Sequence, residues 1–259
     1  MFETSHTKLD PFYLPRPLVF AHRGASAIAP ENTLAAFQAA MDVGADGIEL
    51  DVTRCATGEV VVMHDATVDR TTDGHGRVGE LPLAALRELD AGAWFGREFA
   101  GQRVPLLEEV LDLVGGRLRI NIEIKAEGSG QGLEEALAEQ VIRRGLQGSV
   151  LVSSFHPPAL RRLRQAAREL PRALLLATPL SLSLAWWRNR HELYLQAFHP
   201  QYRLVNAHNL ARMRRAGLRA NVWTVNQEED MLHMIALGVD GIITDRPDRL
   251  RALLPHEGF

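Results

Sequence analysis

The sequence has little of what marks secreted, nucleic-acid-binding or membrane-spanning proteins. Cys55 is its single cysteine, which excludes an internal disulfide and a thiolate metal site and fits a reducing compartment or indifference to redox conditions. The net charge of -3 gives no reason to expect a nucleic acid as partner. No apolar run approaches the roughly 20 residues of a membrane span, and residues 1–17 lack the pattern of a signal peptide. We therefore expect a cytoplasmic protein without stable membrane insertion.

Strand-like and helix-like segments alternate along the chain. The strand-like runs are 18–21, 47–53, 60–64, 118–125, 150–155, 172–177, 219–225 and 241–245. Amphipathic helix patterns lie between many of them, at 33–43, 133–144, 158–170, 209–216 and 228–237. Most of these patterns end just before a glycine, which suits the left-handed position after a helix. The order predicts a parallel sheet, and the length of 259 residues favours an α/β fold of the (β/α)8 TIM-barrel type over an open sheet.

The chain is expected to form a single barrel domain over residues 18–250, with an N-terminal extension at 1–17 and a C-terminal tail at 251–259. Residues 65–105 break the strand–helix rhythm, with turn residues, aromatics and one short helical pattern at 83–88. Loops that follow the carboxyl ends of barrel strands carry function. We therefore predict that this stretch is a small inserted cap subdomain over one mouth of the barrel.

Two of the strand-like runs carry acids where a buried strand is normally apolar. Successive side chains of a strand point to opposite faces, so Glu49 and Asp51 share one face, and Glu123 and Lys125 share another. Carboxylates 4 Å apart repel by about 4 kcal/mol per pair at an effective dielectric of 20. One lysine does not cancel that repulsion, but a cation such as Mg²⁺ or Ca²⁺ would. For either run alone, an antiparallel strand with one solvent-exposed face is an equally good interpretation.

Further polar residues stand at the ends of the predicted strands. His22 and Arg23 follow the first run, Glu31 and Asn32 precede the first helix, and His64 ends the run 60–64. Taken singly, each has a structural alternative: Asn32 or Thr33 as a helix N-cap, Glu31 at the positive end of the helix dipole, and Arg23 in a surface ion pair. Each histidine alone would be a structural or solvated loop residue. Together they favour a site at the carboxyl-end rim of the barrel.

The combined residue set predicts a class of chemistry. A divalent cation together with Arg23 and Lys125 makes a pocket for a phosphate. Two histidines can serve as general acid and general base. The sequence has no Gly-rich Walker loop, so nucleotide hydrolysis of that type is not indicated. The residues alone therefore predict metal-dependent phosphate-ester chemistry in a barrel.

A set of short motifs runs through nearly the whole chain. They are 21–25 (AHRGA), 30–33 (PENT), 47–52 (GIELDV), 64–65 (HD), 70–74 (RTTDG), 122–125 (IEIK), 153–155 (SSF), 222–226 (VWTVN) and 241–247 (GIITDRP). In this combination the sequence closely resembles the glycerophosphodiester phosphodiesterase family, from about residue 18 to 250. The resemblance implies a (β/α)8 barrel with a small inserted cap and hydrolysis of glycerophosphodiesters to glycerol 3-phosphate and an alcohol.

The resemblance also implies roles for individual residues. Glu49, Asp51 and Glu123 match metal ligands, and His22 and His64 match an acid/base pair. The other matches are Arg23 and Lys125 at phosphate-binding positions, Glu31 and Asn32 at supporting positions, and Phe155 and Trp223 as aromatics of the substrate pocket. Two routes stay open: direct attack by water, or attack by the glycerol 2-hydroxyl to give a cyclic phosphate that water then opens.

The expected cofactor is one divalent cation, Mg²⁺ or Ca²⁺, and the expected partner is a small-molecule glycerophosphodiester. A lysophospholipase D on the same scaffold is an alternative, for which Trp186-Trp187 and Trp94-Phe95 are the apolar hints. A barrel that binds a phosphodiester without catalysis is another, but it would predict a lost histidine or metal ligand, and none is lost. The metal in use, the preferred alcohol, and the choice between monomer and homodimer stay open.

Overall fold

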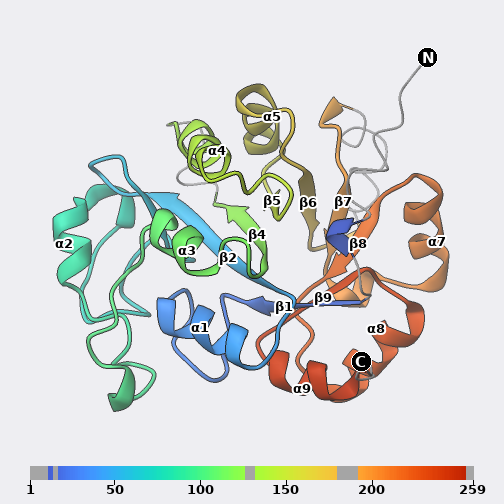
Figure 1. The fold of residues 1–259 in the computed structure, drawn as a ribbon, viewed down its shortest axis with the longest axis horizontal. Helices are drawn as coiled ribbons and strands as arrows, with labels where there is room; N and C mark the ends of the chain where they lie inside the picture. The colour runs from blue at the N-terminus through green and yellow to red at the C-terminus, as the bar shows by residue number, and fades with distance from the viewer. Residues whose placement is uncertain (1–10, 14–16, 126–131, 180–191, 255–259) are drawn as a thin grey trace.

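The barrel closes through its first strand. The computed structural model of the protein describes residues 11–13, 17–125, 132–179 and 192–254. Within these residues eight parallel strands form the barrel, since β1 (Leu18–His22) pairs with β2 (Gly47–Arg54) on one side and with β9 (Gly241–Thr244) on the other. Helices surround the strands (Figure 1). The predicted (β/α)8 barrel is confirmed.

The other barrel strands follow one another around the sheet in chain order. They are β4 (Arg119–Ile124), β5 (Val150–Ser154), β6 (Arg172–Leu176), β7 (Ala197–Pro200) and β8 (Arg219–Val222). One face of each strand packs outward against the helices: in β4 this face carries Ile120, Ile122 and Ile124, all buried in the main apolar core. The opposite face points into the barrel, as the alternation of a strand requires.

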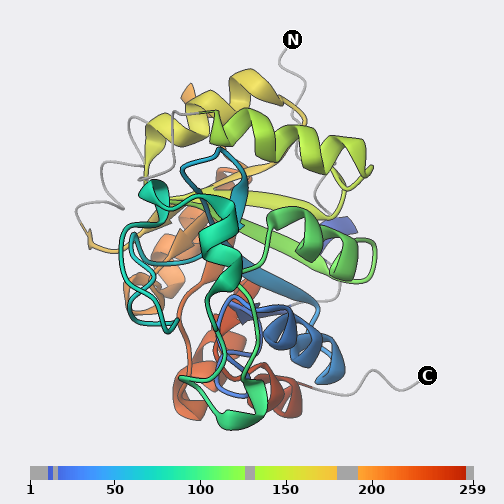
Figure 2. The ribbon, with the colours of Figure 1, turned by 90° about the vertical axis from the view of Figure 1, so that its left-hand side faces the viewer.

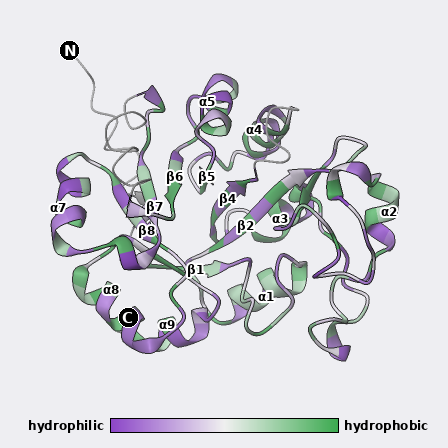
Figure 3. Cartoon of the chain, turned by 180° about the vertical axis from the view of Figure 1, so that it is seen from behind, coloured by the Kyte–Doolittle hydropathy of each residue, from purple (hydrophilic) through white to green (hydrophobic). Residues whose placement is uncertain are grey.

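Amphipathic helices cover the barrel. They are α1 (Leu34–Asp42), α3 (Leu107–Val114), α4 (Leu133–Arg143), α5 (Pro157–Ala166), α7 (Ala207–Arg215), α8 (Glu228–Leu237) and α9 (Pro247–Leu253). Figure 3 shows hydrophobic and hydrophilic residues alternating along α7 and α9, as expected for helices with one face on the strands. Among the described residues, no helix combines the length and the apolar character that a membrane span needs.

One predicted barrel strand is wrong, and one barrel strand lies where none was predicted. The run 60–64 forms β3 (Val60–Val62), which pairs antiparallel with the end of β2 and is not part of the barrel. The missing barrel strand is β7, with His199 and Pro200 among its four residues. Three valines are compatible with a parallel barrel strand and with an antiparallel hairpin strand, so the pattern of the run 60–64 also predicts a barrel strand. The proline in β7 argues against a central strand, so the pattern predicts none there.

The segment between β3 and α3 forms a cap with a small core of its own. It contains α2 (Leu83–Glu88) and the 3-10 turns η3 (Val78–Glu80) and η4 (Arg97–Phe99). Its buried apolar residues include Val68, Leu86 and Val104, which cluster with Cys55 and Val61. In Figure 2 the cap, coloured teal, faces the viewer, and it continues from β3, which pairs with the carboxyl end of β2. The cap is therefore anchored on the β2–β3 hairpin.

Aromatic side chains fill the barrel interior toward its amino end. Phe12 and Tyr13, from the 3-10 turn η2 (Pro11–Tyr13), are buried and cluster with Leu18 and Phe20 of β1. At the other end of the chain, α9 spans residue 250, the predicted boundary between the domain and the tail. The division of the chain into an extension, a domain and a tail stays a prediction. Phe12 and Tyr13 of the predicted extension and helix α9 at the start of the predicted tail both pack on the barrel.

Candidate active site

The predicted acids lie together at the carboxyl end of neighbouring strands. Strand register places His22 of β1 beside Glu49 of β2, and Asp51 of β2 beside Glu123 of β4. One oxygen from each carboxylate lies within 4.8 Å of the others. All three acids are buried, Asp51 to 1 % exposure. An all-oxygen donor set of this kind suits a hard divalent cation.

Two basic side chains partly balance these charges. Lys125 Nζ lies 3.1 Å from Asp51 Oδ1 and 2.7 Å from Glu123 Oε1. Arg23 Nε lies 3.3 Å from Asp51 Oδ2, and the Arg23 backbone N–H donates to Glu49 Oε2 at 3.1 Å. Burial acts to raise the pKa of Asp51, but Lys125 and Arg23 outweigh it and hold that pKa below its usual range. Asp51 is thus a carboxylate at neutral pH.

The pKa of Glu49 shows that Lys125 and Arg23 do not fully balance the negative charge of the acid cluster. Burial and the charge of Asp51 raise the pKa of Glu49 to about 8. The same two causes raise the pKa of Glu123. The cluster therefore cannot hold three full negative charges at neutral pH with Lys125 and Arg23 alone. A divalent cation would supply the missing positive charge, so the donor set and its electrostatics both fit a metal.

The backbone before α1 bends sharply to place Arg23 and Asn32. Both residues have positive φ, 55° and 56°, which is rare without glycine. Gly24 directly follows Arg23, and a Cβ there would come within 2.6 Å of Ala36. Thr33, and not Asn32, caps α1, whereas Asn32 Nδ2 donates to Asp51 Oδ2 at 2.9 Å. The structure thus places Asn32 against the acid cluster, and the capping alternative belongs to its neighbour.

His22 is held by an aspartate that directly follows the last barrel strand. His22 Nδ1 lies 2.6 Å from Asp245 Oδ1, and Asp245 also accepts hydrogen bonds from Ser26 and Asn226. Burial acts to lower the pKa of His22, but Asp245 and Glu49 outweigh it and raise that pKa. Asp245 ends the predicted run 241–245, so a closed barrel places it at the same rim as His22, but the sequence alone does not pair the two residues.

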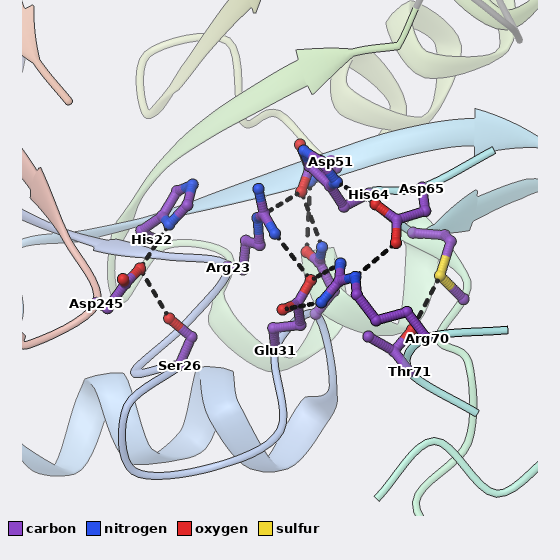
Figure 4. A network of polar contacts seen from close by, with 12 residues as sticks. His22, Arg23, Ser26, Glu31, Asp51, His64, Asp65, Arg70, Thr71 and Asp245 are labelled. Carbon is purple, nitrogen blue, oxygen red and sulfur yellow. Dashed lines mark hydrogen bonds and ion pairs between the residues drawn. The ribbon is translucent and has the colours of Figure 1, made fainter. Parts of the chain in front are cut away.

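His64 has a different acid partner and the opposite electrostatic balance. His64 Nδ1 lies 2.6 Å from Asp65 Oδ1. Burial lowers the pKa of His64, and Asp51 and Asp65 do not compensate fully because Arg23 and Lys125 add to the lowering. Figure 4 shows His22 on one side of Arg23 and His64 on the other. The two imidazoles therefore differ in their affinity for a proton.

One pocket joins these groups. Its lining comprises His22, Arg23, Glu49, His64, Asn121, Glu123, Lys125, Phe155, Leu175, Trp223, Thr224 and Ile243. The rings of Phe155 and Trp223 meet edge to face, with centroids 5.4 Å apart. Asp51, Glu31 and Asn32 are not among these lining residues, Trp94 and Phe95 belong to the cap, and Trp186 and Trp187 fall outside the described residues.

Residues 22–249 match the family model described as the glycerophosphoryl diester phosphodiesterase family. The chain belongs to this family. It is 42% identical over 252 residues to a glycerophosphodiester phosphodiesterase of Caldanaerobacter subterraneus subsp. tengcongensis, an alignment that covers 94% of this chain and 100% of that protein. It is 35% identical over 248 residues to a Bacillus subtilis protein of the same name, covering 90% and 85%.

Solved structures give the same result. A phosphodiesterase from Oleispira antarctica, in complex with the product sn-glycerol-3-phosphate, superposes with a TM-score of 0.82 at 30% identity, covering 91% of this chain and 96% of that one. A glycerophosphodiester phosphodiesterase from Agrobacterium tumefaciens superposes with a TM-score of 0.81 at 31% identity, covering 91% and 99%. The predicted family is confirmed, and the chain is an enzyme of the phosphodiester hydrolase class.

Proposed function

We propose that this enzyme hydrolyses small glycerophosphodiesters to glycerol 3-phosphate and an alcohol. The observation that carries the proposal is that one pocket is lined by both histidines, two acids of the carboxylate cluster and two basic side chains. The product complex of the Oleispira antarctica relative supports glycerol 3-phosphate as a ligand of this kind of pocket. Hydrolysis needs proton transfer to and from oxygen and stabilisation of negative charge on the phosphate, and the pocket offers side chains for both.

Glu49, Asp51 and Glu123 are proposed to hold one divalent cation, Mg²⁺ or Ca²⁺. When bound, it would neutralise charge on the phosphate oxygens. Arg23 and Lys125 are proposed to contact the same phosphate. Both side chains line the pocket, and both form an ion pair with Asp51 of the acid cluster. Asn32 supports Asp51 through its hydrogen bond, and Glu31 supports Arg23.

His22 and His64 are proposed as the acid/base pair. Asp245 and Asp65 bond Nδ1 of the two rings, which leaves the Nε2 edge of each ring for the substrate. Different proton affinities let one ring accept a proton while the other donates one. The pH profiles of single variants would assign the two roles, because each variant loses only the limb that its own histidine controls.

Phe155 and Trp223 are proposed to form the wall that packs on the glycerol or the alcohol. Phe155 is 47% exposed at the mouth of the pocket, which suits a surface that substrate covers. The proposal includes a cytoplasmic location and no nucleic-acid partner, based on the composition. Assembly as a homodimer is left to measurement of the molar mass in solution.

The test is a turnover panel with the purified enzyme. The substrates are glycerophosphocholine, glycerophosphoethanolamine and lysophosphatidylcholine, each with Mg²⁺, with Ca²⁺ and with chelator. Release of glycerol 3-phosphate from the first two, lost with chelator, is expected. Preference for lysophosphatidylcholine would favour the lysophospholipase D alternative, and binding without turnover would favour the non-catalytic one.

The 2-deoxy analogue of glycerophosphocholine separates the two chemical routes. If the glycerol 2-hydroxyl attacks phosphorus, the analogue should not turn over, whereas exchange of choline for ethanolamine should change the rate modestly. A site that bonds a hydroxyl also rejects an analogue without it. Comparable single-turnover rates for the analogue and the natural substrate would mean that water attacks directly.

A further inference from the structure

The inserted cap contacts the site through Arg70. Arg70 Nε lies 2.6 Å from Asp65 Oδ2. Its Nη1 and Nη2 donate to Oε2 and Oε1 of Glu31, each at 2.8 Å. Such a two-point pair fixes direction as well as distance. Figure 4 shows the guanidinium between the two acids, on the side away from His22.

Each acid that Arg70 bonds holds a residue that lines the pocket. Asp65 Oδ1 lies 2.6 Å from His64 Nδ1. Glu31 Oε1 also accepts a hydrogen bond from Arg23 Nη1, at 2.9 Å. Arg70 is not itself among the described residues that line the pocket. The chain of contacts therefore runs from His64 through Arg70 to Arg23 without a direct contact between Arg70 and the pocket.

We infer that Arg70 is a positioning residue that fixes His64 and Arg23 relative to one another, through Asp65 and Glu31. This inference rests on the proposed function, in which His64 moves a proton and Arg23 binds the phosphate. A general acid or base must lie within hydrogen-bond distance of its target, and small misplacements of reacting groups lower the rate steeply. The Arg70 side chain is 46% exposed, and ion pairs at that exposure add little to stability. Its contacts therefore matter for geometry more than for folding.

The cap offers a matched control in Arg87. Arg87 of α2 also makes a two-point pair with a glutamate, at 2.7 Å and 2.8 Å to Glu109 of α3. Its side chain is 34% exposed, and it is not among the described residues that line the pocket. Loss of Arg87 thus removes a comparable bond between the cap and a barrel helix without touching Asp65 or Glu31.

The experiment measures kcat and KM for Arg70→Ala, Arg70→Lys and Arg87→Ala with glycerophosphocholine. Arg70→Ala is expected to lower kcat by roughly 10- to 100-fold, and millimolar guanidinium ion should restore part of it. Arg70→Lys keeps the charge but cannot span both acids, so its kcat should also be low. If the alanine variant does not fold, the kcat of Arg70→Lys tests the inference in its place. Arg87→Ala should keep kcat. Full activity of Arg70→Lys, or equal kcat in both alanine variants, would overturn the inference.

Two further substitutions, Asp65→Asn and His64→Ala, separate this inference from the proposed function. In an Asp65→Asn background, Arg70→Ala should lower kcat much less than in the wild type, because the path through Asp65 is already broken. Equal losses in both backgrounds would show that Arg70 does not act through Asp65. Wild-type kcat in His64→Ala would overturn the proposed role of His64, and the positioning role of Arg70 with it. A slow His64→Ala together with an unimpaired Arg70→Ala would overturn only the inference about Arg70.

Discussion

At the amino end of the barrel, β1 points Leu18 and Phe20 inward against Phe12 and Tyr13, and the guanidinium groups of Arg119 and Arg219 lie over these two rings. Two residues after Phe20, the same face of the same strand carries His22, which lies against Asp245. Apolar burial at the amino end stabilises the fold. Buried like charges at the carboxyl end work against it. The barrel thus separates the residues that support it from those that react, and the two sets should respond differently to substitution.

The largest effect is expected from the acid cluster. Glu49→Ala, Asp51→Ala and Glu123→Ala should each lower kcat/KM by roughly 10³-fold or more, since a catalytic cation supplies several kcal/mol. The far-ultraviolet circular dichroism spectrum should stay that of the wild type, because the amino-end core is untouched. Metal content by elemental analysis gives a second readout. Full activity of the metal-free enzyme would contradict this prediction.

The histidines come next. His22→Ala and His64→Ala should each lower kcat by about 10²–10⁴-fold, the usual contribution of a general acid or base. The matched control is His75→Ala, since His75 is an exposed cap residue that pairs with Asp69 away from the pocket. Near wild-type kcat in either site variant would mean that its histidine has a structural role.

Substitution at the amino end should give the reverse pattern. Phe12→Ala removes a buried ring that stacks near Phe20, and it should lower the free energy of unfolding by about 3 kcal/mol. Below its unfolding transition, the variant should keep the kcat of the wild type. Trp94→Ala, at a 43% exposed cap aromatic, is the control and should cost less stability. A large loss of kcat in folded Phe12→Ala would break the separation between the two ends.

The pH dependence of stability should reveal the electrostatic repulsion within the acid cluster. Without metal, the pKa of Glu49 is raised from 4.5 to about 8, so the folded state binds this proton more tightly than the unfolded state. Its contribution to stability is complete below pH 4.5 and is lost as the pH rises through about 8. In chelator, the unfolding temperature of the wild type should fall over this window, and that of Glu49→Gln should fall less. Identical slopes of unfolding temperature against pH in the two proteins would show that Glu49 is not the group that causes this pH dependence.

The smallest effect concerns Asp245. This aspartate acts to raise the pKa of His22 against the lowering effect of burial, so Asp245→Asn should lower that pKa. The limb of the pH–rate profile that depends on His22 should therefore move to lower pH, while the limb set by His64 stays in place. A shift of both limbs would indicate that the two histidines are coupled.

Strand-by-strand patterns predicted most of the barrel from the sequence. The runs at 47–53 and 118–125 became β2 and β4, and alternation alone placed Glu49 and Glu123 on the inner face. The predictions failed for β3, whose three valines suit a barrel strand and a hairpin strand equally, and for β7, whose four residues include His199 and Pro200. In both places the residue types do not indicate which strands pair, so tertiary pairing decides.

The site was predictable only as far as its residues sit at strand ends. Parallel strands bring their carboxyl ends to one edge, which gathers His22 and Glu123 without any further information. The supporting contacts of Asp245 and Arg70 depend on long-range packing, and the Arg70–Glu31 pair spans 39 residues. No periodicity encodes such a pair, so the network around the histidines became visible only in the folded chain.

The closure of the barrel has a consequence for the life of the chain in the cell. His22 and Asp245 are 223 residues apart, and they meet only because β1 pairs with β9. During synthesis, a growing chain therefore carries His22 long before the strand that orients it exists. Turnover should begin only after β9 has left the ribosome and joined the first strand, so that the onset of activity reports completion of the fold. Contacts this distant in sequence also slow folding, because closing the long intervening loop costs chain entropy.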